Sequence, residues 1–103
     1  MPKYRGEITK VAESDIIDIF RHIALDNTAA ADNWVNEIEK QINSLEKFPL
    51  RCPVIPESQD LGKEYRYIIY GNYRTIFRIE GLRVFIMRVI HGARLLDLRP
   101  LQK

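Results

Sequence analysis

The sequence predicts one α+β domain in the order β-α-α-β-β-β, with a helical hairpin packed on an antiparallel sheet. Three observations predict this architecture. The chain has 103 residues, enough for one hydrophobic core without disulfides or metals. Its first half carries apolar residues at helical spacing, and its second half carries three apolar runs of strand length. No repeat or linker divides the chain, so residues 1–103 are interpreted as a single domain.

The first half predicts a short strand followed by a helix. The strand is expected at Lys3–Thr9, and the side-chain oxygen of Thr9 can cap the helix that follows. From Val11 to Leu25 the apolar positions recur every three or four residues, which is typical of an amphipathic helix. Asp26-Asn27 ends this helix, and the link to the next one is so short that the two helices must be antiparallel neighbours.

A second helix is expected to be capped by Thr28 and to end at the residue before Pro49. Its apolar stripe consists of Ala31, Trp34, Ile38, Ile42, Leu45 and Phe48. A residue that precedes a proline is disfavoured in the helical conformation, so the helix is expected to end there. Trp34 is interpreted as a core residue of this stripe.

The segment Leu50–Lys63 is predicted to be an extended loop, because it contains Pro53, Pro56 and Gly62. It is longer than most connections, and loops of this length are often functional or folded against the body of the domain. Cys52 is interpreted as a small apolar residue of this loop.

The second half predicts an antiparallel meander of three strands rich in Ile, Tyr, Phe and Val. The strands are expected at Tyr65–Tyr70, Tyr73–Glu80 and Arg83–Ile90. Gly71-Asn72 and Gly81-Leu82 separate them, and pairs that contain Gly or Asn supply the positive φ of a tight hairpin. After the last strand, Gly92–Leu98 is expected to form one helical turn.

Composition bounds the class of protein more than its function. Hydrophobic residues make up 46% and charged residues 29% of the chain, which is ordinary for a globular domain. The formal net charge of +2 is too small to identify a partner. Cys52 is the single cysteine, which favours a reducing compartment. The N-terminus does not resemble a signal peptide, and no apolar run approaches the roughly 18 residues of a membrane span. A cytoplasmic protein without a membrane partner is therefore expected.

Common catalytic and cofactor motifs are absent from the sequence. His22, His91 and Cys52 are too far apart to indicate a metal site. The glycines are isolated at turns, so they do not form a phosphate-binding loop. The serines do not fall at a strand-to-helix elbow. No metal and no cofactor is expected.

The meander and its exit carry six arginines: Arg66, Arg74, Arg78, Arg83, Arg88 and Arg94. A guanidinium group offers a planar fork that fits phosphate. Two interpretations stay open. The arginines form one cationic face that binds an anionic macromolecule, or they pair with Glu64, Glu80 and Asp97 on a solvated face, at about 0–1 kcal/mol per pair. His91 likewise is either an acid or base catalyst or a strand-end histidine that bonds a carbonyl.

The segments SLEKFPLRCPVIPE, LGKEYRYIIYGNYRTIFRI and VFIMRVIHGAR, in this order of elements, resemble the RelE/ParE family of toxins from bacterial type II toxin–antitoxin pairs. The resemblance spans nearly the whole chain, and it depends on the order and spacing of segments rather than on one diagnostic motif. It implies a small toxin that inhibits growth and is held inactive by a co-expressed antitoxin.

The two branches of this family imply different targets. RelE-like members are ribosome-dependent endoribonucleases that cut mRNA, and on this chain that mechanism would use Arg74 to hold the phosphate, assisted by His91 and Arg94. ParE-like members inhibit DNA gyrase and lack a nuclease centre. Here Lys63 is the cation that the loop offers next to the meander, and the tyrosine near the C-terminus of many RelE-like members is missing. The long helical hairpin and the ending VIHGARLLDL are closer to the ParE branch. Gyrase inhibition is therefore the expected function, and whether the chain is an enzyme stays open.

The resemblance also implies which residues meet the partners. The residues expected to bind the target, gyrase or the ribosome with its mRNA, are Arg66, Arg74, Arg88, His91 and Arg94. The antitoxin is expected to use a disordered, acidic tail that lays a helix in a groove and adds a strand to a sheet edge. The sequence does not identify the residues that bind it.

Overall fold

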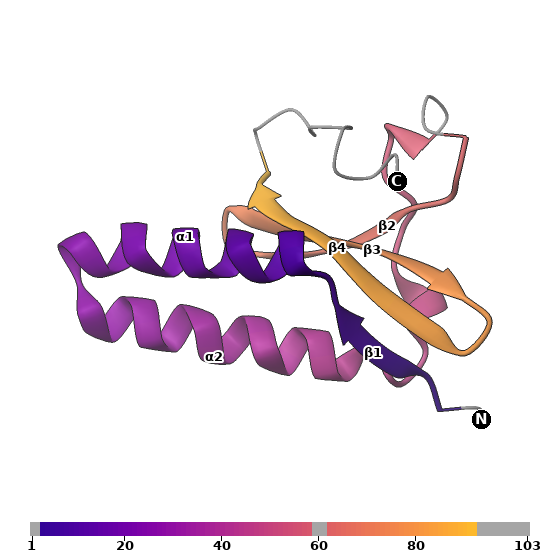
Figure 1. The fold of residues 1–103 in the computed structure, drawn as a ribbon, viewed down its shortest axis with the longest axis horizontal. Coiled ribbons are helices and arrows are strands. Elements are labelled where there is room, and N and C mark those ends of the chain that lie inside the picture. The colour runs from indigo at the N-terminus through magenta and orange to yellow at the C-terminus, as the bar shows by residue number, and fades with distance from the viewer. Residues whose placement is uncertain (1–2, 59–61, 93–103) are drawn as a thin grey trace.

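A computed structural model describes residues 3–58 and 62–92 of the chain (Figure 1). It confirms the α+β class and the predicted order of elements. These are β1 (Arg5–Ile8), α1 (Lys10–Asp26), α2 (Thr28–Ser44), a 3-10 turn (Pro49–Arg51), β2 (Arg66–Tyr70), β3 (Tyr73–Glu80) and β4 (Arg83–His91). Neither described helix is long and apolar enough to cross a membrane. The turn predicted at Gly92–Leu98 lies, from residue 93 on, outside the described residues.

The sheet has the order β1-β4-β3-β2. The three C-terminal strands form the predicted antiparallel meander, and Gly71 and Gly81 adopt the positive φ that its two hairpin turns require. However, β1 pairs with β4 in parallel, so the sheet is mixed and not antiparallel throughout. The reason is topological: both helices and two strands intervene between β1 and β4, and such a crossover can deliver a strand in parallel, which a tight hairpin cannot.

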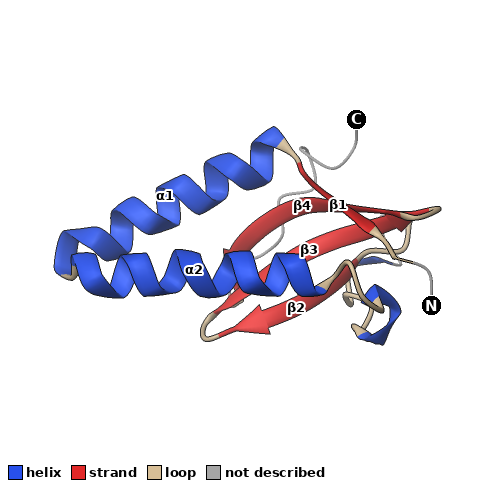
Figure 2. Ribbon diagram, turned by 90° about the horizontal axis from the view of Figure 1, so that it is seen from below, coloured by secondary structure: helices blue, strands red, loops and turns tan. Residues whose placement is uncertain are grey.

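The two helices lie side by side on one face of the sheet, and their connecting turn projects past the strands (Figure 2). The main core forms between these layers. Its fully buried members are Ala12, Trp34, Ile38, Ile42 and Leu45 from the helical side, Phe77, Val84, Ile86 and Val89 from the sheet, and Cys52. The predicted stripe of the second helix is thus confirmed up to Leu45, as is the core position of Trp34.

The predicted cap of the second helix at Thr28 is wrong, because the Asn27 side chain accepts from the Ala30 amide at 3.0 Å and Thr28 is the first helical residue. The second helix also ends earlier than predicted. It stops at Ser44, and Phe48 adopts a left-handed conformation with a φ of 53° and leaves its side chain 50% exposed. The guanidinium of Arg51 donates hydrogen bonds to the carbonyls of Lys47 and Phe48, each at 2.9 Å. The chain therefore turns before Pro49 because Arg51 satisfies the carbonyls that a longer helix would have bonded itself.

The proline-containing segment folds back on the other face of the sheet. Val54 forms an antiparallel bridge with Arg66, and the Ile55 amide donates to the Tyr65 carbonyl at 2.8 Å. Ile55 is fully buried in a second small core with Tyr65, Ile76 and Ile90. The described part of this loop is therefore packed against the domain, as its length suggested.

The outer edge of β2 is already occupied by hydrogen bonds from within the chain. The Tyr67 amide donates to the Pro53 carbonyl at 3.1 Å. The Gln41 side-chain amide, on α2, donates to the Ile69 carbonyl at 2.9 Å. Because these outward-facing groups are paired, a further strand could join β2 only by displacing them.

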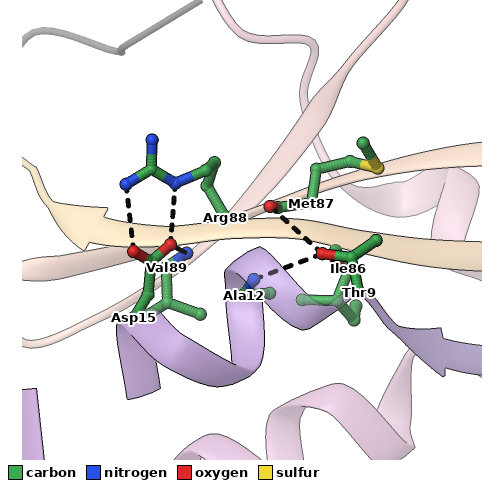
Figure 3. A network of polar contacts seen from close by, with 7 residues as sticks. All are labelled: Thr9, Ala12, Asp15, Ile86, Met87, Arg88 and Val89. Atoms are coloured by element: carbon green, nitrogen blue, oxygen red, sulfur yellow. Dashed lines mark hydrogen bonds and ion pairs between the residues drawn. The ribbon is translucent and has the colours of Figure 1, made fainter. Parts of the chain in front are cut away.

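A polar cluster holds α1 against β4 at the point where β1 ends (Figure 3). Thr9 caps the helix as predicted, since its Oγ1 accepts from the Ala12 amide at 3.2 Å, and the same hydroxyl donates to the Ile86 carbonyl at 2.8 Å. Further along α1, about one helical turn after Ala12, the Asp15 carboxylate accepts from the Val89 amide at 3.0 Å. It also accepts from Arg88, at 2.7 Å from Nε and 3.0 Å from Nη2.

A β-bulge explains the position of Arg88. Phe77 is paired with Ile86 and Ile76 with Arg88, so Met87 is an extra residue in β4. The extra residue shifts the alternation of the strand, and Val89 rather than Arg88 faces the helices. Arg88 then reaches past the edge of β4 to Asp15, and only 8% of its surface stays exposed.

Replacement of Asp15 by Ala should lower the free energy of unfolding by about 3 kcal/mol or more, because it leaves the buried Arg88 guanidinium without its carboxylate. Urea denaturation followed by circular dichroism measures this. The exposed Asp18, three residues further along α1, is the control, and Asp18→Ala should change stability by less than about 0.5 kcal/mol. Equal effects of the two substitutions would contradict the structural role of Asp15.

Candidate functional site

A hollow of about 410 Å³ lies where the β2–β3 turn meets the end of β4. It is lined by Pro56, Tyr67, Ile69, Gly71, Asn72, Tyr73, Arg74, His91 and Gly92. We call it the Arg74 hollow. It brings together two residues that the sequence singled out separately, Arg74 from β3 and His91 from β4. The third residue of the predicted nuclease set, Arg94, lies outside the described residues.

Register and ring packing fix His91 at this hollow. Tyr73 and His91 are paired across β3 and β4, and their rings meet edge to face with centroids 5.6 Å apart. Tyr73 in turn packs edge to face on Trp34 of α2, at 5.4 Å. The Gly92 amide donates to the Asn72 carbonyl at 2.6 Å, so the turn and the end of β4 are joined. The position of His91 therefore follows from the core through two aromatic contacts.

Arg74 is not free in the hollow, because Glu57 binds it from the proline-containing segment. Its Nη1 and Nη2 donate to the two carboxylate oxygens of Glu57, at 3.2 and 2.6 Å. The hydrogen bonds from Arg74 hold the pKa of Glu57 below its ordinary value, against partial burial, which acts in the opposite direction. A guanidinium that is engaged in this two-point contact has its phosphate-binding fork already filled.

The remaining arginines of the meander are paired as well. Ion pairs join Arg66 to Glu64, Arg78 to Glu80, Arg83 to Glu7 and Arg88 to Asp15. In the register, Arg66 faces the same side as Phe77 in the main core, whereas Arg74 and Arg78 face the side of Ile76. The hypothesis of one free cationic face is therefore wrong for the described arginines. The alternative of local pairs is confirmed for Glu64 and Glu80, and Asp97 lies outside the described residues.

Sequence reasoning missed Glu57, which changes the chemistry of the hollow most. A single glutamate between two prolines and a polar run carries no periodic or motif signal. The contact becomes visible only when the fold brings residue 57 beside residue 74. The one usable signal was the length of the loop, which suggested that it packs on the domain.

The described residues give little support for other chemistry. No three His, Cys, Asp or Glu side chains among them gather to hold a metal ion. Cys52 is buried as a free thiol, and this burial raises its pKa, so it is a core residue and not a reactive nucleophile.

The order of elements and the meander with its two-helix layer agree with a family of known proteins. The family model for the ParE toxin of the type II toxin–antitoxin system, parDE, matches residues 7–96. The chain belongs to the ParE toxin family. No curated protein sequence matches it.

Solved toxin–antitoxin structures share the fold of this chain. The chromosomal ParDE toxin–antitoxin system from P. aeruginosa superimposes with a TM-score of 0.68 at 18% sequence identity, over 88% of this chain and 98% of that one. The toxin–antitoxin complex RelBE2 from Mycobacterium tuberculosis superimposes with a TM-score of 0.59 at 26% identity, over 91% of this chain and 97% of that one. The resemblance inferred from the sequence is thereby confirmed, including its tendency towards ParE.

The Glu57–Arg74 pair predicts a specific response of this ParE-family chain to acid. Since the pKa of Glu57 is lowered in the folded state, the pair stabilises the fold fully above the ordinary value of 4.5 and loses this effect as the pH falls through the folded value. Between pH 6 and pH 3, the stability of the wild type should therefore fall more steeply than that of Glu57→Gln. Urea denaturation at a series of pH values measures the two slopes.

The matching control removes Arg74, whose hydrogen bonds lower the pKa of Glu57. In an Arg74→Gln background, the same Glu57→Gln substitution should no longer change the pH dependence. Parallel curves for the wild type and Glu57→Gln would contradict the assigned ion pair.

Proposed function

We propose that this chain is a growth-inhibiting toxin whose target is DNA gyrase. The observation that carries the proposal is the ParE toxin match over residues 7–96. In the resemblance described above, ParE-like members inhibit gyrase and lack a nuclease centre. A protein that acts on gyrase works where the chromosome is, so the proposal includes a cytoplasmic location.

The Arg74 hollow supports a binding toxin over a ribonuclease. Cleavage of RNA through a 2′-hydroxyl needs a base, an acid and a group that stabilises the developing charge on the phosphate. Among the described residues lining the hollow, Arg74 is the one Lys or Arg side chain, and its two terminal nitrogens are bonded to Glu57. The stabilising group is thus engaged before any substrate arrives.

The predicted target-binding residues differ in how directly they could act. His91 is exposed, so it can meet a partner without unfolding of the domain. Arg88 is buried on Asp15, so its replacement would act through the fold. Arg66 donates to the Cys52 carbonyl at 2.6 Å and to Glu64, which places it in the framework of the loop. We therefore propose His91, together with Arg94 beyond the described residues, as the positions where the target is contacted first.

A cognate antitoxin is the second partner in this proposal. One structural relative is a ParDE toxin–antitoxin system and the other is the RelBE2 toxin–antitoxin complex. The antitoxin is proposed to be a largely disordered, acidic segment that folds on this chain. Since the outer edge of β2 is occupied by Pro53 and Gln41, an added strand would find the shorter β1 on the other side of the sheet more accessible.

One observation favours a second candidate function, a RelE-like endoribonuclease. Arg74 and His91 line the same hollow, and the M. tuberculosis RelBE2 complex is among the structural relatives. In this alternative, substrate RNA would displace Glu57, and His91 would exchange a proton with the reacting oxygen.

The two functions predict opposite results on induction. For the gyrase toxin, expression should trigger the DNA damage response while transcripts stay intact, because a stalled gyrase leaves broken DNA and no cut RNA. Purified protein should also inhibit supercoiling by gyrase. Northern blots and a damage-responsive reporter, read in the same culture, measure both effects.

Substitution in the hollow gives the second arm of this test. Arg74→Ala should retain toxicity within about threefold, since the gyrase proposal does not use a phosphate site there. Arg21→Ala, an exposed arginine on α1, is the control for expression and growth. Cleaved transcripts that disappear in Arg74→Ala and His91→Ala would overturn the gyrase proposal in favour of the ribonuclease.

A further inference from the structure

The Glu57–Arg74 contact has the geometry of a bound ligand. Two roughly parallel N–H to oxygen bonds of 3.2 and 2.6 Å are the contacts that a guanidinium makes with an external carboxylate or phosphate. The side chains are largely shielded from water, with 11% of Arg74 and 28% of Glu57 exposed. The Nε of Arg74 is buried and has no partner among the described residues. Arg74 therefore has the form of an anion site that is filled from inside the molecule.

The chain holds Glu57 in this place from both sides. Two residues before it, Ile55 is buried on the sheet, and its amide donates to the Tyr65 carbonyl at 2.8 Å. One residue after it, the Ser58 hydroxyl donates to the same carbonyl at 3.1 Å and accepts from the Tyr65 amide at 3.0 Å. A carboxylate delivered from so fixed a frame competes as an intramolecular ligand with a high effective concentration.

The rest of the hollow would otherwise suit a phosphate-bearing ligand. Tyr67, which lies on the same face of the sheet as Arg74, supplies ring surface in the hollow, and an aromatic ring near a guanidinium is a common feature of sites that bind nucleic acids. With Glu57 in place, the formal charges of the Arg74 pair cancel. The hollow thus has space beside Arg74 but lacks the net positive charge that a phosphate-bearing ligand would meet.

We propose that Glu57 is an internal anion that closes the Arg74 hollow to phosphate groups and so determines which class of target this toxin can engage. This inference deepens the proposed gyrase-directed function, on which its biological meaning rests. The closure itself is a property of the isolated protein and can be measured without gyrase.

The test compares phosphate binding by the full-length purified wild type and by Glu57→Gln, which keeps the size of the side chain and removes its charge. Inorganic phosphate is titrated while the NMR signals of the amides of residues 71–74 and of the Arg74 Nε–H are followed. The wild type should show no saturable change at millimolar phosphate. Glu57→Gln should bind at least about tenfold more tightly, because the charge-assisted bonds of Arg74 become available.

Two further variants locate the effect. Glu80→Gln frees Arg78, which lies over the Phe85 ring outside the hollow, and it should leave phosphate binding as in the wild type. The double variant Glu57→Gln/Arg74→Gln should lose the gain. The proposal is overturned if the wild type already binds as tightly as Glu57→Gln, if Glu80→Gln gives the same gain, or if the gain survives without Arg74.

A second variant and a second ligand complete the phosphate-binding test. If Glu57→Gln does not fold, Glu57→Asp is used, because its shorter carboxylate cannot make both bonds from the same backbone position and should bind phosphate more tightly than the wild type. A short single-stranded RNA, titrated alongside phosphate, shows whether the excluded group belongs to a nucleic acid or to a small anion. If the protein does not inhibit gyrase in separate assays, the proposed function is wrong. The phosphate-binding result, which is measured without gyrase, would still hold.

Discussion

The carboxylate of Asp15 is the contact on which the arrangement of helices and sheet depends. β1 has four residues and β4 has nine, so the last part of β4 has no strand beside it on that edge. Asp15 takes the place of the missing strand by accepting the Val89 amide and the Arg88 guanidinium. The Thr9 hydroxyl donates to the Ile86 carbonyl, which lies earlier on β4 than Val89. The start of α1 therefore bonds the edge of β4 at the point where the pairing with β1 stops. The position of the helical hairpin over the sheet, and with it the main core, follows from these bonds.

Much of the fold could be predicted because the decisive signals are local. The apolar spacing from Ala31 to Leu45 places one face of α2, and Gly71 and Gly81 punctuate the meander where positive φ is needed. The features that escaped prediction depend on residues distant in sequence. The parallel pairing of β1 needs the whole crossover. The end of α2 needs Arg51, which bonds the Lys47 and Phe48 carbonyls that follow the helix. The bulge at Met87 is set by the pairing with β3.

The candidate site shows the same division. The sequence identified Arg74 and His91, and the fold brings them to one hollow. It could not show that each described arginine of the meander has a carboxylate partner, because the partners are as distant as Asp15, 73 residues from Arg88. An arginine in an antiparallel strand is thus weak evidence for a binding surface until its acidic neighbours are known. In this chain three of the guanidinium groups join segments of the fold. Arg66 and Arg74 bond the proline-containing loop to the sheet, and Arg88 bonds α1 to β4.

The paired backbone of β2 has a consequence for the chain when it is made in excess. An open outer strand is a template on which identical molecules stack edge to edge and aggregate. The Gln41 side-chain amide and the Pro53 carbonyl bond two of its outward-facing backbone groups, the Ile69 carbonyl and the Tyr67 amide. On this flank the tertiary fold itself therefore pairs part of the strand edge on which identical molecules could otherwise stack.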